Sequence, residues 1–105
     1  MILEIAQLQV KPGQGAGFEA AFRTAQSIMA SMPGYLGHEL QKCVERADHY
    51  MLLVRWVSIE HHELGFRQSE GYQEWRALLH HFYDPFPTVL HYAQVAGPGL
   101  AAAAV

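Results

Sequence analysis

HYMLLVRWV, residues 49–57, is rich in β-branched and aromatic residues and predicts a β-strand. Its alternate positions form two faces, residues 50, 52, 54 and 56 on one and residues 51, 53, 55 and 57 on the other, and both faces are mostly apolar. A strand of an antiparallel sheet with one face in water alternates cleanly between apolar and polar residues. We therefore expect helices to cover one face of this strand and a partner protein to cover the other.

Two strands and a helix are predicted ahead of this stretch. Within residues 14–32 the apolar residues recur with the spacing of an amphipathic helix, and Pro33-Gly34 ends it. A polar loop over residues 45–48 separates residues 49–57 from the strand before it. The two predicted strands are residues 2–10 and 35–44.

Two helical segments and a last strand are predicted after it. Ser58 and Ser69 are expected to cap a short helix over residues 59–67 and a longer helix over residues 70–82. Residues 88–95 predict the fourth strand. The order β-α-β-β-α-β, with the second helix broken in two, predicts an α+β, ferredoxin-like fold with an antiparallel sheet.

The chain length of 105 residues predicts a single domain. We assign this domain to residues 1–95. Residues 96–105 are rich in glycine and alanine and are expected to form a flexible C-terminal tail.

The composition argues against several classes of protein. The formal net charge is −3 and the lysines and arginines are scattered, which argues against nucleic-acid binding. Cys43 is the only cysteine, so an internal disulfide and a CxxC site are excluded. No apolar run approaches the roughly 20 residues that span a bilayer. The N-terminus lacks a secretory signal pattern, so we expect no membrane association and a cytoplasmic protein.

Four segments together resemble the antibiotic-biosynthesis-monooxygenase family. They are MPGYLGHEL at residues 32–40, RWVSIEHH at residues 55–62, FRQSEGYQEW at residues 66–75 and TVLHY at residues 88–92. Each motif alone is common, but their order and spacing match over residues 2–95. The resemblance implies a dimeric α+β barrel in which two sheets pack face to face. It also implies a pocket between the helices and the sheet of each subunit.

Known members of this family include cofactor-free oxygenases of quinols and anthrones, and haem-degrading enzymes. Haem-degrading members carry an asparagine on the first strand, then a tryptophan and a histidine in the second helical region. By position this sequence has Gln7, Phe66 and Arg76 instead, so an axial ligand for haem iron is missing. Together with the aromatic, metal-poor composition, the resemblance therefore implies an enzyme that needs no cofactor and oxidises a small aromatic, quinol- or anthrone-like substrate with O2.

Three residues are candidates for the catalytic groups that this chemistry needs, which are a base and a polar group that orients the substrate. Gln7 lies mid-strand among apolar neighbours and could orient the substrate. His38 is a candidate base because a histidine titrates near neutral pH. His62 matches the family pattern at the start of the broken helix. Each could instead be an ordinary structural residue, bonded to nearby backbone or packed within the fold.

Four further residues are candidates for binding the substrate: Trp56, Phe66, Tyr72 and Arg76. The three aromatic residues have a spacing that equally suits a hydrophobic core, and Arg76 could be a solvated helix residue. The adjacent pairs His61-His62 and His80-His81 point apart on a helix, so we expect no metal site.

Two other functions remain open at this stage. The same fold could serve as a non-catalytic ligand-binding or stress-related dimeric module. A purely structural dimer is the third possibility, and it predicts that no cavity of drug size lies between the helices and the sheet.

Overall fold

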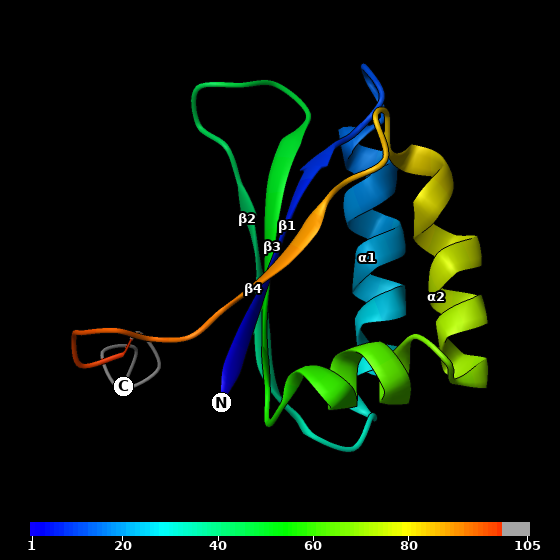
Figure 1. Ribbon diagram of the computed structural model, residues 1–105. Coiled ribbons are helices and arrows are strands. Elements are labelled where there is room, and N and C mark those ends of the chain that lie inside the picture. The colour runs from blue at the N-terminus through cyan, green and yellow to red at the C-terminus, as the bar shows by residue number, and fades with distance from the viewer. Residues whose placement is uncertain (100–105) are drawn as a thin grey trace.

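The computed structural model describes residues 1–99 and has two layers, a four-stranded sheet with helices on one face only (Figure 1). Among these residues no helix combines the length and the apolar character needed to cross a membrane. The elements are β1 (Ile2–Gln9), α1 (Gly15–Ala30), β2 (Tyr35–Lys42), β3 (His49–Trp56), the π-helix η1 (His61–Phe66), α2 (Glu70–Leu79), the short 3-10 helix η2 (His80–Phe82) and β4 (Val89–Tyr92).

The strands lie in the order β2-β3-β1-β4, and all neighbouring pairs are antiparallel. This order and the alternation of strands and helices confirm the predicted α+β, ferredoxin-like fold. β3 and β1 lie at the centre of the sheet, so each is paired on both sides. Leu52 of β3, for example, lies opposite Ala6 of β1 and Leu40 of β2.

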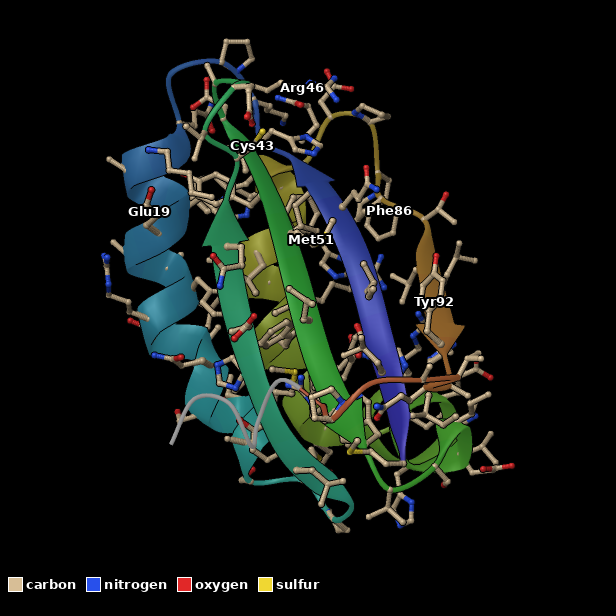
Figure 2. All side chains as sticks on the ribbon, turned by 90° about the vertical axis from the view of Figure 1, so that its left-hand side faces the viewer. Glu19, Cys43, Arg46, Met51, Phe86 and Tyr92 are labelled. Carbon is tan, nitrogen blue, oxygen red and sulfur yellow. The ribbon has the colours of Figure 1, made fainter. Side chains whose placement is uncertain are left out.

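The helices cover the face of β3 that carries Tyr50, Leu52, Val54 and Trp56, all of which are buried. The stripe of α1 that was predicted from spacing packs against them, with Phe18, Phe22, Ala25 and Met29 buried. Alternation along a strand then turns Met51, Leu53 and Arg55 to the opposite face. Figure 2 looks onto this outer face, where Met51 and Tyr92 are labelled, and no helix covers it.

β4 (Val89–Tyr92) is shorter than the predicted strand over residues 88–95. Its pairs with β1 run from Val89 opposite Ala6 to Tyr92 opposite Leu3. Residues 93–95 are exposed and are not part of the strand. Residues 96–98 are exposed, and residues 100–105 of the predicted tail lie outside the described residues.

The helical region between β3 and β4 is divided more finely than its periodicity predicts. Ser69 caps α2 as expected, since its Oγ accepts a hydrogen bond from the Tyr72 backbone N–H at 3.1 Å. Ser58 Oγ accepts from the His61 N–H at 3.3 Å. The predicted helix over residues 59–67 contains the π-helical turn η1, and the last three residues of the predicted helix over residues 70–82 form η2. A π-helical turn has a wider repeat than the 3.6-residue spacing on which the prediction depended.

Gly34 makes the turn that connects α1 to β2 and also supports the start of η1. Its φ is 83°, a conformation that glycine adopts most readily. Its carbonyl accepts a hydrogen bond from the Val57 N–H at 2.8 Å. A Cβ at this position would lie 2.3 Å from the imidazole ring of His61. Gly34 therefore allows the close approach of the turn to the strand-to-helix passage.

Replacing Gly34 tests this close packing, and Gly37 in the same motif provides a matched control. We expect Gly34→Ala to lower the free energy of unfolding by about 1–3 kcal/mol, because it adds both backbone strain and a clash. A Cβ at Gly37 meets no atom within 4 Å, so Gly37→Ala should leave stability unchanged or raise it by up to about 1 kcal/mol. Urea denaturation followed by circular dichroism measures both. Equal stabilities of the two variants would contradict this account of the turn.

Candidate functional site

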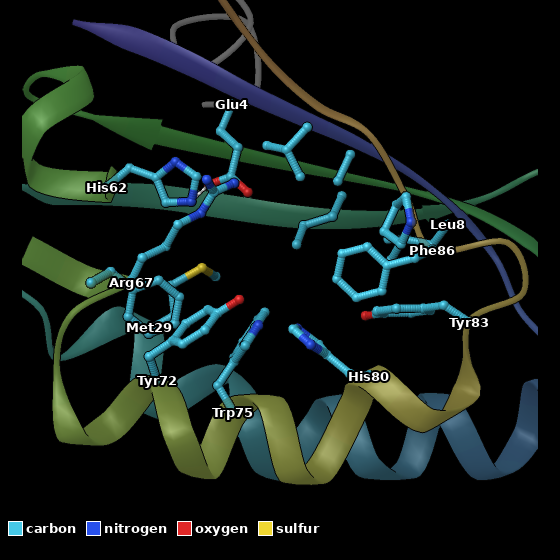
Figure 3. Close-up of a pocket in the computed structure, with 15 residues that line it drawn as sticks. Glu4, Leu8, Met29, His62, Arg67, Tyr72, Trp75, His80, Tyr83 and Phe86 are labelled. Carbon is cyan, nitrogen blue, oxygen red and sulfur yellow. Dashed lines mark ion pairs between the residues drawn. The ribbon is translucent and has the colours of Figure 1, made fainter. Parts of the chain in front are cut away.

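A cavity of about 410 Å³ lies between the sheet and α2 (Figure 3). β1 and β3 supply its roof, η1 closes one end, and α2 forms its floor with Tyr72 and Trp75. The segment over residues 80–87 closes the other end. Its volume falls within the range of sites that hold small molecules.

Glu4 is the buried carboxyl group of this cavity. It lies mid-strand in β1 with 6% of its surface exposed. Its Oε1 accepts a hydrogen bond from the indole N–H of Trp56 at 2.9 Å. Burial raises the pKa of Glu4 to about 6, although the Trp56 hydrogen bond and the charge of Arg67 act in the opposite direction. The carboxyl is therefore mostly ionised at pH 7 and yet more basic than an exposed glutamate.

His62 lies between this carboxyl and a second histidine. Its Nε2 is 3.3 Å from Glu4 Oε1, and its Nδ1 is 2.8 Å from Nε2 of His91. The imidazole stacks on the Trp56 indole, with ring centroids 5.5 Å apart and an angle of 19° between the planes. Burial, together with the charges of Arg67 and His91, lowers the pKa of His62 to about 3. The ring is therefore neutral at pH 7, and its 3.3 Å approach to Glu4 is a contact between an uncharged imidazole and a carboxylate rather than an ion pair.

Arg67, the residue after η1, supplies the positive charge of the cavity. Figure 3 shows its side chain reaching towards Glu4 and His62. Arg76, the cation predicted from sequence, is instead exposed on α2 and does not line the cavity. The reason is helical geometry, because Trp75 points into the cavity and the next residue is rotated by about 100° around the helix axis.

Polar groups on aromatic rings also line the cavity. Figure 3 shows the Tyr83 hydroxyl and the His80 imidazole directed into the space at the end opposite His62, and the Tyr72 hydroxyl directed into it from the floor nearer Arg67. Burial raises the pKa of Tyr83, and burial also lowers the pKa of His80. Both side chains are therefore uncharged at neutral pH and can hydrogen-bond to a ligand.

Phe86 closes the cavity at this end and is shared with a second hollow. Its ring packs against His80, with ring centroids 5.0 Å apart, while 63% of its surface is exposed. Phe86 and Pro87 also line a hollow of about 430 Å³ on the outer face of the sheet. These two residues therefore form a wall between the cavity and the outer face, and Phe86 is visible from both sides (Figures 2 and 3).

The structure brings three of the predicted residues into the cavity, namely His62, Phe66 and Tyr72. Trp56 is fully buried behind them and does not line the cavity, although it donates to Glu4. Trp56 is therefore part of the core and a support for the site at once.

Gln7 and His38 lie away from the cavity. Gln7 is exposed on the outer face, because Ala6 and Leu8 on either side of it face the helices. His38 faces α1 from β2 and lines a different groove. Its Nδ1 hydrogen-bonds with the Tyr35 hydroxyl, its Nε2 lies 2.9 Å from Gln26 Oε1, and burial lowers its pKa.

The groups that sequence reasoning missed are Glu4, Arg67, His80, Tyr83 and His91. Glu4 did leave a signal, since it interrupts an otherwise apolar face formed by Ile2, Ala6, Leu8 and Val10. A charged residue on a buried face requires a partner, which marks it as a site candidate. The other four depend on long-range packing and leave no comparable signal. Within residues 1–99, no three histidine, cysteine or acidic side chains form a cluster that could hold a metal ion.

Comparison with solved structures agrees with this architecture. A Bordetella bronchiseptica protein assigned to the antibiotic biosynthesis monooxygenases superimposes with a TM-score of 0.86 and 36% identity, over 90% of this chain and 97% of that one. SnoaB, a cofactor-independent oxygenase from Streptomyces nogalater, superimposes with a TM-score of 0.73 and 19% identity, over 94% of this chain and 95% of that one. At that identity SnoaB supports the fold alone.

Sequence comparison gives the family. YczJ, an uncharacterised protein of Bacillus subtilis (strain 168), is 52% identical over 95 residues, which are 90% of this chain and all of YczJ. The family model described as "Antibiotic biosynthesis monooxygenase" matches residues 1–78. The chain thus belongs to the antibiotic biosynthesis monooxygenase family.

Proposed function

We propose that this protein is a cofactor-independent monooxygenase that oxidises a small aromatic, quinol- or anthrone-like substrate with O2. The observation that carries the proposal is the presence of a buried, basic carboxyl, Glu4, and the Arg67 guanidinium in one cavity walled by aromatic rings. Family membership supports the reaction class. SnoaB, which shares the fold, is itself described as a cofactor-independent oxygenase.

In this proposal Glu4 takes the acidic proton of the substrate. A base works best when its pKa lies near the operating pH, and burial brings the pKa of Glu4 to about 6. The proton moves from the substrate to a carboxylate oxygen and leaves an electron-rich anion. His62 is too weak a base for this step, because its pKa of about 3 keeps it from holding a proton at neutral pH. This assignment moves the base from the predicted histidines to Glu4.

Arg67 stabilises the anion that forms. A fixed positive charge in a cavity that excludes water stabilises developing negative charge more strongly than the same charge does in water. The aromatic walls, Phe66, Tyr72 and Trp75 among them, hold the flat ring of the substrate.

The anion then reduces O2, so the substrate itself supplies the electrons. For an anthrone-like CH2 group, one oxygen atom becomes the new carbonyl and the other leaves as water with the two hydrogens. The substrate loses two C–H bonds and gains one C=O bond, which accounts for all four electrons that O2 accepts. No further reductant is required.

The cavity also helps to separate the two alternative functions, a structural dimer and a ligand-binding module. A purely structural dimer predicts no space for a ligand, whereas the cavity has a volume of about 410 Å³. A ligand-binding module without turnover would use the same cavity, and the measurements below separate it from an enzyme.

We further propose that the protein works as a homodimer formed through the outer face of the sheet. Leu90 and Tyr92 of β4 are 54% and 48% exposed there, and Leu3, Ile5 and Leu53 lie on the same face, partly exposed. Exposed apolar patches of this kind mark interaction sites. A second copy of the same sheet would cover this face.

Oxygen uptake by the Glu4 variant tests the proposed reaction. With metal-free and flavin-free protein and a panel of hydroquinones and anthrones, oxygen uptake should exceed the uncatalysed rate. Glu4→Gln should lower kcat by about 100-fold or more, because the amide removes the base but can still accept the Trp56 hydrogen bond. Arg76→Ala alters an exposed residue outside the cavity and should leave kcat unchanged. Binding of these compounds without oxygen uptake would instead support the ligand-binding module.

The pH dependence of kcat/KM tests the assignment of Glu4 as the base. Glu4 must be ionised to act as a base, so the rate should fall as the pH drops below about 6, by about tenfold for each pH unit. Arg67→Met removes the charge that favours the carboxylate, so it should raise the pKa of Glu4 and move this limb to higher pH. A limb that stays at the same pH in Arg67→Met would contradict the assignment of Glu4 as the base.

The mass of the protein in solution tests the proposed dimer. Leu53 lies near the middle of the outer face, opposite Ile5 of β1 and Glu39 of β2. Light scattering at micromolar concentration should give the mass of a dimer for the unaltered protein and of a monomer for Leu53→Arg. Leu64→Arg is the matched control, because Leu64 is 60% exposed on η1, away from this face. A monomeric unaltered protein would overturn the proposal.

A further inference from the structure

Three polar side chains from three different elements meet at one end of the cavity. Glu4 of β1 and His91 of β4 lie directly opposite each other in the sheet register. His62 of η1 lies between their side chains and contacts both, at 3.3 Å from Glu4 Oε1 and 2.8 Å from His91 Nε2. His91 itself is partly exposed and does not line the cavity. The three therefore form a chain of polar contacts that runs from the cavity towards the surface, with a hydrogen bond between the two histidines and a 3.3 Å contact between His62 and Glu4.

The direction of each hydrogen bond follows from the chemistry of the groups. An ionised carboxylate can only accept, and Glu4 already accepts from the Trp56 indole. We expect His62 Nε2, 3.3 Å from Glu4 Oε1, to carry a proton, because a lone pair at that nitrogen would face the carboxylate and be repelled. A neutral imidazole has one N–H only, so His62 Nδ1 accepts, and Nε2 of His91 donates to it. Both nitrogens of the buried His62 ring have a partner in this arrangement.

We propose that His91 is a positioning residue, which fixes His62 in the tautomer that donates to Glu4 and thereby holds Glu4 as the carboxylate that acts as base. This inference rests on the role of Glu4 in the proposed function. His91 touches neither the cavity nor the substrate, so its effect reaches the site only through His62.

Loss of the His91 donor changes the balance at Glu4. His62 Nδ1 then has no partner in either tautomer, so the preference for the Nε2–H form weakens and the Nδ1–H form becomes more populated. The Nδ1–H tautomer turns a lone pair of Nε2 towards Glu4, which favours a protonated carboxyl. The charged and titratable groups that face Glu4 are His62, Arg67 and, through His62, His91. Of these, only the interaction of His62 Nε2 with Glu4 changes sign with the tautomer.

Nuclear magnetic resonance tests the tautomer without any substrate. In protein labelled with 15N-histidine, two-bond 1H–15N correlations at pH 7.5 should show the proton of His62 on Nε2. In His91→Phe, which has no donor, the His62 signals should shift towards the Nδ1–H form. His91→Gln keeps an amide N–H near the place of Nε2 and should restore the original signals. A His62 ring protonated on Nδ1 in the unaltered protein would overturn the inference.

The titration of Glu4 gives the second readout. The 13C shift of its carboxyl should report a midpoint about one pH unit higher in His91→Phe than in the unaltered protein, because the carboxylate loses a donor. His91→Gln should keep the original midpoint, and so should His81→Phe, which removes an exposed histidine elsewhere.

An unchanged midpoint in His91→Phe would overturn the positioning role. If that variant fails to fold, the tautomer of the unaltered protein and the midpoint in His91→Gln decide the question. Because neither readout uses oxygen uptake, a failure of the proposed reaction remains distinguishable from a failure of this inference.

Discussion

The hydrogen bond from the Trp56 indole to the Glu4 carboxylate joins the hydrophobic core to the candidate site. Burying an ionised group without a partner is strongly unfavourable, so Glu4 depends on this donor and on His62. Trp56 lies opposite Ile2 in the sheet register, which places Glu4 diagonally across from it on the same face. His62 then stacks on the same indole. One core side chain therefore orients both the carboxyl and its neighbouring imidazole.

Local sequence patterns were sufficient for most of the fold. Two apolar faces on β3, the apolar stripe of α1 and the Ser69 cap correctly predicted the element order and helices on one face of the sheet. The errors fell where a boundary depends on a distant partner. β4 ends at Tyr92, with its last pair to β1, and η1 has a repeat that a 3.6-residue pattern does not describe.

The site was harder to predict than the fold, for reasons that particular residues illustrate. His62, Phe66 and Tyr72 reach the cavity as the family motifs imply. Arg76 does not, because one residue along a helix is a rotation of about 100°, and Arg67 lines the cavity instead. His91 joins the site through pairing between the two ends of the chain, which no local pattern reveals.

Phe86 and Pro87 separate the cavity from the hollow on the outer face of the sheet. The side chain at position 86 thus helps to shape two surfaces. One is the wall of the cavity, and the other is the hollow on the outer face of the sheet. A larger or smaller residue there would alter both at once. In relatives that diverge at this position, the preferred ligand and the fit of any molecule seated on the outer face would therefore evolve together, so that neither trait is free to drift alone.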